Sequence, residues 1–238
     1  MNAASALRRA RLLFCSTLLL CATTAHAEVG GTVRLASQER FRGYSVSGGY
    51  PAATVSLSYD DVSGPYVEGS VMVAGGFSHG DTRTRLEADA GYALRLKAGP
   101  TLDAGIVHAE YSGYRIQGDR AVFTEVYAGL ITGPLSAHLH YSPSYFQHGV
   151  ATIYGDVDGA IPLSPRIHFM GHYGLLFQVE GPHAWADRPM RDWRIGASTD
   201  MGKFNLALAL ASGARKRSVY GPAKNDGTAL ILAVTRAF

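Results

Sequence analysis

The chain has 238 residues and a formal net charge of +3, and both of its cysteines, Cys15 and Cys21, lie near the N-terminus. Three N-terminal arginines, Arg8, Arg9 and Arg11, account for the charge excess, so the rest of the chain is balanced and does not favour nucleic-acid binding. The length fits one domain, and no disulfide framework or cysteine metal site is expected beyond the N-terminal region.

The first 27 residues have the pattern of a secretory signal peptide. The basic start is followed by an apolar run, 12–25, and Ala25-His26-Ala27 fits the small-x-small cleavage rule. The run is shorter than the roughly 20 residues of a membrane helix. A lipoprotein signal at Cys21 is an alternative, but Leu20 stands where a small residue is expected. We therefore expect residues 1–27 to be cleaved and Glu28 to begin a single exported domain, residues 28–238.

Beyond residue 27, apolar and polar residues alternate with the period of two that is typical of strands. In the segment 52–61, for example, Val55, Leu57 and Tyr59 share one face, while serine and aspartate occupy the other. No segment has a helical period or the length of a membrane helix. The predicted strands are 31–41, 52–61, 65–76, 83–96, 100–111, 123–132, 135–143, 151–162, 166–179, 191–201, 203–212 and 228–238.

The connections between these strands alternate between short and long. The short ones contain Gly, Pro or both, as tight turns do, and they lie at 62–65, 97–100, 132–134, 163–165 and 201–203. In an antiparallel meander, this alternation places every short turn at one end of the sheet and the longer loops at the other.

Short turns, long loops and strands of this length are typical of a transmembrane β-barrel, in which closure satisfies every backbone group in lipid. A soluble barrel or sandwich is the alternative. Its polar faces would meet water, whereas here the faces opposite the apolar ones mix Gly, Ala and Ser with charges, as a lumen does. We predict an all-β, twelve-stranded antiparallel transmembrane β-barrel (a meander), preceded by a cleaved signal peptide, in the Gram-negative outer membrane.

The alternation also predicts which charged and histidine side chains line the lumen. The candidates are Arg34, Arg40, Asp60, Glu68, Arg85, Glu87, Asp89, Arg95, Asp103, Glu125, His138, His140, Asp156, Asp158, His168, His172, Arg194 and Asp200. Opposite charges are expected to pair along the wall, and the remaining acids to raise the local cation concentration. This predicts a weak preference for cations.

The final residue, Phe238, ends an alternating apolar strand. Closing a barrel requires the last strand to pair with the first, and an aromatic residue at the rim suits the membrane interface. A terminal Phe in this setting resembles the signal by which outer-membrane proteins are recognised for insertion. We therefore predict that Phe238 is an assembly signal.

Hydrolysis of lipid is an alternative function, because His138, His140, Ser142 and Ser144 could supply a base and a nucleophile. The alternation points the histidines and Ser142 into the lumen, away from acyl chains, so we favour lumen lining and expect no catalytic residue.

Neither a metal site nor a cofactor is expected. His168 and His172 are too far apart along one strand to chelate a metal alone. Asp156 and Asp158 resemble a calcium loop, but they lie within a strand and lack the other ligands. The basic stretch 215–224, with its arginines and lysines, fits either a solvated loop or contact with anionic lipopolysaccharide.

Three groups of residues resemble the TorF-type porin family of proteobacteria, over nearly the whole chain beyond residue 27. The first is Ser37, Phe41-Arg42-Gly43, Ser45, Ser47 and Pro51-Ala52. The middle group is Glu125-Val126-Tyr127-Ala128-Gly129, Tyr141-Ser142-Pro143 and Tyr145-Phe146, and the last is Asp192-Trp193, Gly196 and Phe238. The resemblance implies an outer-membrane location and a pore, but no particular substrate. Ser144 stands where the family usually has an acidic residue, so a role for that acid is not implied here.

Together these features predict a narrow porin-like channel for small hydrophilic solutes. The alternatives are an outer-membrane lipid hydrolase and a structural or receptor barrel without a pore. The expected partners are outer-membrane lipid and lipopolysaccharide, the outer-membrane assembly machinery and small solutes, but no nucleic acid.

Overall fold

The computed structural model describes residues 27–75, 82–97, 99–114, 121–181, 189–213 and 227–238, so residues 1–26 of the predicted signal peptide lie outside it. The strands are β1 (Glu28–Ala36), β2 (Arg40–Phe41), β3 (Tyr44–Ser45), β4 (Ala52–Asp60), β5 (Pro65–Gly75), β6 (Thr82–Arg95), β7 (Thr101–Ser112), β8 (Ala121–Thr132), β9 (Leu135–Ser142), β10 (Ala151–Pro162), β11 (Ile167–Glu180), β12 (Met190–Met201), β13 (Phe204–Ser212) and β14 (Ala229–Ala237). In the described ranges no helix is long and apolar enough to span a membrane.

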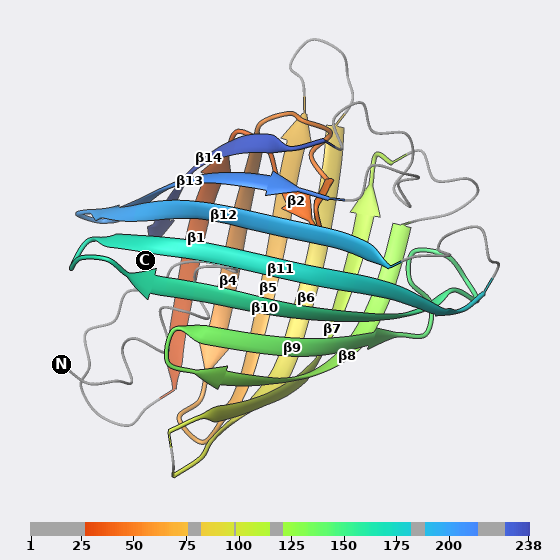
Figure 1. Ribbon diagram of the computed structural model, residues 1–238, viewed down its shortest axis with the longest axis horizontal. Coiled ribbons are helices and arrows are strands. Elements are labelled where there is room, and N and C mark those ends of the chain that lie inside the picture. Colours follow the sequence, from red (N-terminus) through yellow and green to blue (C-terminus); the bar gives the residue numbers. More distant parts are fainter. Residues whose placement is uncertain (1–26, 76–81, 98, 115–120, 182–188, 214–226) are drawn as a thin grey trace.

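The twelve long strands close into one antiparallel barrel, in which neighbours along the chain are neighbours in the wall (Figure 1). β14 closes the barrel by pairing with β1 over five residue pairs. The peptide groups of Gly31 and Phe238 exchange two hydrogen bonds of 3.0 Å, which extend this seam to the last residue. The prediction of an all-β, twelve-stranded antiparallel barrel is confirmed.

The outer face of the barrel is mainly apolar, with exceptions such as His108 and Glu110 near the loop end of β7. Leu57, Leu139 and Leu232, which point outward, are 58%, 58% and 55% exposed. Between them, the side chains at alternate positions point inward and are mostly buried or half-buried. A soluble protein rarely exposes so continuous an apolar surface, whereas a membrane barrel presents one to lipid. The alternative of a soluble barrel or sandwich, in which these apolar faces would be buried, is therefore wrong.

The two ends of the barrel differ. At one end, which we call the turn end, tight connections join successive strands, as Figure 1 shows for β10 with β11 and for β12 with β13. At the other, the loop end, the connections 37–51 and 143–150 are described in full. The other connections at this end, which include 76–81, 115–120, 182–188 and 214–226, lie wholly or partly outside the described residues.

The connection 37–51 departs from the sequence prediction. We predicted a strand over 31–41, but β1 ends at Ala36, and Arg40 lies in the short β2–β3 hairpin instead of the barrel wall. Residues 37–51, which we call the inner loop, fold into the lumen, because Tyr44, Val46 and Ser47 are no more than 2% exposed. Alternation alone cannot distinguish a strand of the wall from a strand of a hairpin.

The turn of this hairpin explains why the chain can fold back so tightly. Arg42 and Gly43 both have positive φ angles, 47° and 79°, as a type I′ turn requires. A Cβ atom on Gly43 would lie only 2.5 Å from the Cα of Gly213 and 2.7 Å from the Cβ of Asp192. Only glycine allows the inner loop to approach the wall this closely.

Cysteine labelling would test the orientation of the barrel. His148 at the loop end and Ser63 at the turn end are both exposed. Because short turns face the periplasm in outer-membrane barrels, we expect His148→Cys to react with a membrane-impermeant maleimide on intact cells. Ser63→Cys should react only after the outer membrane is permeabilised. The opposite labelling pattern would reverse the assigned orientation.

Candidate functional site

A cavity of about 590 Å³ lies in the lumen between the inner loop and the turn end. Its wall is formed by inward side chains of the strands and by residues 39–43 of the inner loop. Most of the residues predicted to line the lumen lie in its wall: Asp60, Glu68, Arg85, Glu87, Asp89, Arg95, Asp103, Glu125, His138, His140, Asp156, Asp158, His172 and Arg194, with Arg40 contributed by the inner loop.

Three predicted lumen residues lie outside this wall. Arg34 points inward and pairs with Glu39, with Nε 3.4 Å from Oε2. His168 is only 7% exposed near the turn end. Asp200 accepts a hydrogen bond of 2.8 Å from Asn205.

Apolar side chains fill the loop end of the described lumen. The buried cluster, which we call the plug, consists of Tyr44, Val46, Ala52, Met72, Ala74, Ala109, Tyr111, Ala121, Phe123, Tyr145, Phe146, Tyr154 and Leu176. Phe123 packs against Phe146 and Tyr145, with ring centroids 4.9 and 5.5 Å apart. Each such aromatic pair stabilises the fold by about 0.5–1.5 kcal/mol beyond the contribution of the apolar area that it buries. The plug therefore holds the inner loop in the lumen.

Arg42, at the tip of the inner loop, makes a bidentate ion pair with Glu125 on β8. The two guanidinium nitrogens lie 2.7 and 2.5 Å from the two carboxylate oxygens. Both side chains are buried, at 6% and 2% exposed. Two parallel charge-assisted hydrogen bonds are the strongest arrangement that these groups can form. We call this pair the latch.

Aromatic rings surround the guanidinium of the latch. Its Cζ atom lies 3.9 Å from the ring centroid of Tyr154 and 4.8 Å from that of Phe41, which places it within cation–π distance. Burial lowers the pKa of Arg42, but the charge of Glu125 and the neighbouring tyrosines outweigh it and raise that pKa well above its usual value. The guanidinium of Arg42 therefore stays charged.

A second contact holds the inner loop from β7. Tyr114, just beyond the end of that strand, donates a hydrogen bond from its hydroxyl to the carbonyl of Val46. Burial raises the pKa of Tyr114 to about 12, so the hydroxyl keeps the proton that it donates.

Below the latch, tyrosines lie flat on the wall because glycines face them. Tyr66 lies opposite Gly91, and Tyr127 lies opposite Gly105, in neighbouring strands. A Cβ on Gly91 would lie 2.3 Å from the hydroxyl of Tyr66, and one on Gly105 would lie 2.5 Å from that of Tyr127. These glycines make room for rings whose hydroxyls reach the acids of the cavity.

The tyrosine hydroxyls connect two aspartates across the wall. Tyr127 donates to Asp89 over 2.8 Å, and Tyr66 donates to Asp103 over 2.9 Å, while the two hydroxyls also contact each other. His138 approaches the second oxygen of Asp103 at 3.3 Å. The result is a continuous polar track along the cavity.

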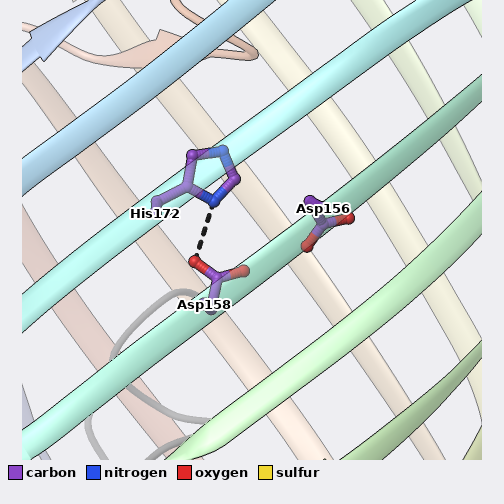
Figure 2. Close-up of side chains that lie close together, drawn as sticks. All are labelled: Asp156, Asp158 and His172. Carbon is purple, nitrogen blue, oxygen red and sulfur yellow. Dashed lines mark hydrogen bonds and ion pairs between the residues drawn. The ribbon is translucent and has the colours of Figure 1, made fainter.

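A cluster of acids and histidine lies on β10, β11 and β12. Asp158 lies directly opposite His172, and its Oδ1 is 2.8 Å from Nδ1 of the imidazole. Asp156 lies two residues along β10 on the same face, as Figure 2 shows. The other imidazole nitrogen, Nε2, is 2.8 Å from Oδ1 of Asp192 on β12. One oxygen of Asp156 also lies 3.2 Å from Nε2 of His140.

Carboxylates outnumber basic groups in the cavity wall. Among the described residues twelve acids and five arginines line it, together with His138, His140 and His172. Even with all three histidines protonated, the acids remain in excess. The field inside the cavity therefore favours positive charge.

The geometry does not assemble the serine and histidine of the hydrolase alternative. The hydroxyl of Ser142 donates to the carbonyl of Thr124 over 2.9 Å. His138 and His140 face Asp103 and Asp156. Among the described residues, neither imidazole is hydrogen-bonded to the hydroxyl of Ser142, so no pair of serine and base is formed.

Residues 21–236 match the profile of a family described as "Bacterial protein of unknown function (Gcw_chp)". The chain belongs to this family. The search of curated proteins found no match. The more specific resemblance to TorF-type porins stays a prediction, because the family match does not name them.

Solved outer-membrane barrels share the fold. A KdgM porin matches with a TM-score of 0.54 at 13% identity, covering 88% of this chain and 99% of that one. The NanC porin matches with 0.60 at 10% identity, covering 87% and 98%. An outer-membrane channel from Pseudomonas putida F1 matches with 0.51 at 15% identity, covering 91% and 97%. At such low identities these matches concern the fold.

Several residues of the site were absent from the predicted lumen set. Asp192 has the same parity on β12 as Arg194, so alternation could have identified it. Tyr66, Tyr127 and Tyr154 also point inward by parity, but the predicted set contains only charged residues and histidines. Arg42 could not be found in this way, because it lies in the inner loop.

Proposed function

We propose that the protein is an outer-membrane channel for small hydrophilic solutes, with a preference for cations. The observation that carries this proposal is an acid-rich cavity inside a closed barrel whose outer face is mainly apolar. Outer-membrane lipid, including lipopolysaccharide, and the outer-membrane assembly machinery are its proposed partners. The basic stretch 215–224, which could contact lipopolysaccharide, lies outside the described residues.

The excess of acids in the cavity wall makes this barrel unsuited to acidic sugars. A KdgM porin has been solved in complex with disordered oligogalacturonate, which is a polyanion. A lumen in which carboxylates outnumber guanidiniums repels such a ligand. We therefore propose neutral or cationic solutes for this barrel.

A second candidate is a barrel whose lumen is closed at rest. The plug and the latched inner loop favour it, since they occupy the loop end of the described lumen. Under this proposal solutes pass only when the inner loop moves. The structural or receptor role predicted as an alternative is the limiting case in which it never moves.

Ion selectivity measures the charge argument directly. In a planar bilayer with a tenfold salt gradient, we expect the refolded protein to give a reversal potential of cation-selective sign. The preference should fade near 1 M salt, where the screening length falls to about 3 Å. An anion-selective sign would contradict the proposal. Conductance only after the inner loop is released would favour the barrel that is closed at rest, and no conductance even then would favour the structural or receptor role.

Matched variants locate the source of the selectivity. Glu68 and Glu87, on neighbouring strands, line the cavity together with Asp89. Changing all three to their amides should move the reversal potential towards zero. Glu180→Gln is the control, because Glu180 is exposed at the loop-end limit of β11 and lies outside the cavity wall.

A further inference from the structure

The acid–histidine cluster on β10 and β11 has the donor set of a metal site. One oxygen each from Asp156 and Asp158 and one nitrogen of His172 all lie within 4.8 Å of one another. Asp156 and Asp158 are two residues apart on one strand, so both point into the lumen, and register places His172 opposite Asp158 (Figure 2). The three side chains are therefore arranged to share one ligand.

A glycine makes room for two side chains beside this cluster. The residue opposite Asp156 on β11 is Gly174, which has no side chain to cover the carboxylate. A Cβ at Gly174 would lie 2.0 Å from the hydroxyl of Tyr154 and 2.7 Å from Oδ2 of Asp192. The side chains of Tyr154 and Asp192 therefore occupy the space beside Gly174.

Asp192 orients the imidazole. Metal-binding histidines usually donate their second ring nitrogen to a carboxylate, which fixes the tautomer and leaves the first nitrogen free to bind. Here Nε2 of His172 lies 2.8 Å from Asp192. When Nε2 carries the proton, the lone pair of Nδ1 points at an oxygen of Asp158, 2.8 Å away. With a proton on Nδ1 this contact is a hydrogen bond, and a metal ion bound to Nδ1 and the carboxylate would take the place of that proton.

The balance of charged groups around the cluster also favours a divalent cation. The charge of Arg194 interacts with Asp158 and Asp192. The neighbouring latch and the Arg34–Glu39 pair are each neutral overall. Asp156, Asp158 and Asp192 therefore outnumber the nearby guanidinium, and this excess of carboxylates favours a bound cation.

We propose that Asp156, Asp158 and His172 bind a divalent transition-metal ion inside the barrel, with Asp192 positioning the imidazole. One imidazole and two carboxylates suit Zn²⁺, Co²⁺ and related ions, and three protein ligands leave a coordination position for water or a solute. All three residues line the cavity, so an ion can reach them. The inference goes beyond the proposed channel, since binding does not require conductance.

Calorimetric titration of the refolded full-length barrel in detergent with Zn²⁺ tests the proposal. We expect one ion to bind each barrel. Asp158→Asn and His172→Gln should abolish or greatly weaken binding, and Asp192→Asn should weaken it about 10–100-fold, as loss of an orienting carboxylate does. His168→Gln is the matched control, because this inward histidine of the same strand lies outside the cavity wall.

Co²⁺ gives a second readout that needs no variant. Bound to the native barrel, it should produce visible absorption bands that excess Zn²⁺ removes. If the native barrel binds neither ion, the proposal is wrong. Equal loss in His168→Gln and His172→Gln would also overturn it. Because folding in detergent is checked by heat-modifiable gel mobility, failure to bind metal remains distinct from failure to conduct.

Discussion

Glu125→Gln should lower the free energy of unfolding of the barrel by about 3–5 kcal/mol, the cost of breaking a buried ion pair by removing one partner. The glutamine nearly preserves the shape of Glu125 but leaves the guanidinium of Arg42 buried without a countercharge. Both side chains are almost inaccessible, so water cannot replace the lost carboxylate. Urea unfolding in detergent, followed by circular dichroism, measures the loss.

The double variant Arg42→Met with Glu125→Leu separates charge from packing. Replacing a whole buried pair by apolar groups is often neutral or stabilising, so the double variant should be more stable than Glu125→Gln. Arg34→Gln is the control, because the Arg34–Glu39 pair is partly exposed and worth at most about 1 kcal/mol. Equal stability of Glu125→Gln and the native barrel would show that the latch contributes nothing.

Conductance gives the functional consequence of the same change. A latch that holds the inner loop in the lumen should, when broken, allow the loop to leave more often. We expect the single-channel conductance or the open fraction of Glu125→Gln to rise above that of the native barrel. If the latch variant is destabilised but conducts as the native barrel does, the inner loop does not control conduction.

The motifs that resemble TorF-type porins are far apart in sequence but meet around the latch. Arg42 of the first motif binds Glu125 of the second, and its guanidinium lies 5.3 Å from the ring of Tyr145. Gly43 lies against Asp192 of the last motif. Part of each motif therefore builds the contact between the inner loop and the wall, while other motif residues, such as Val126 and Tyr141, are exposed on the outer face.

The barrel could be predicted because its rules are local. Alternation with period two gives each residue its side of the wall, and turn chemistry gives the short connections. Closure follows because an open edge would leave unpaired peptide groups. The inward direction of Glu68, Asp103 and His172 needs no more than this parity.

The inner loop and the acid–histidine cluster could not be predicted, because they depend on which residues far apart in the sequence lie side by side in the fold. Nothing local distinguishes Arg40 in a hairpin from Arg40 in a wall strand. Asp158 and His172 face each other only because β10 and β11 pair in one register, and a slip of two residues would separate them. The aspartate pair at 156 and 158 therefore looked like an incomplete calcium loop within a strand.

Apolar inward residues gave a signal that sequence reasoning did not use. Met72 and Ala74 on β5, and Tyr111 on β7, point into the lumen by parity, although a water-filled lumen should be polar. Each lies at the loop end of its strand. Such residues require an apolar partner within the lumen, and Tyr44 and Val46 of the inner loop supply it.

Phe238→Asp should sharply reduce the folded barrel recovered from the outer membrane of cells. Phe238 closes the seam by exchanging two hydrogen bonds with Gly31, and its ring would contact a Cβ at that glycine. The side chain itself is 66% exposed on the outer rim. An acidic residue near the membrane interface costs only about 0–1 kcal/mol, so stability alone predicts a small effect. A large loss in cells would therefore come from failed recognition during assembly.

Phe204→Asp is the matched control for this prediction. Phe204 is a second exposed aromatic residue at the turn end, where it lies opposite Arg236 on β14. Replacing it by Asp introduces the same charge at the same rim of the barrel. We expect Phe204→Asp to assemble in cells nearly as the native chain does, and both variants to refold alike in detergent, as judged by heat-modifiable gel mobility. Equal assembly of both variants in cells would contradict the role of Phe238 as an assembly signal. Failure of Phe238→Asp alone to refold in detergent would place its role in the seam between β1 and β14.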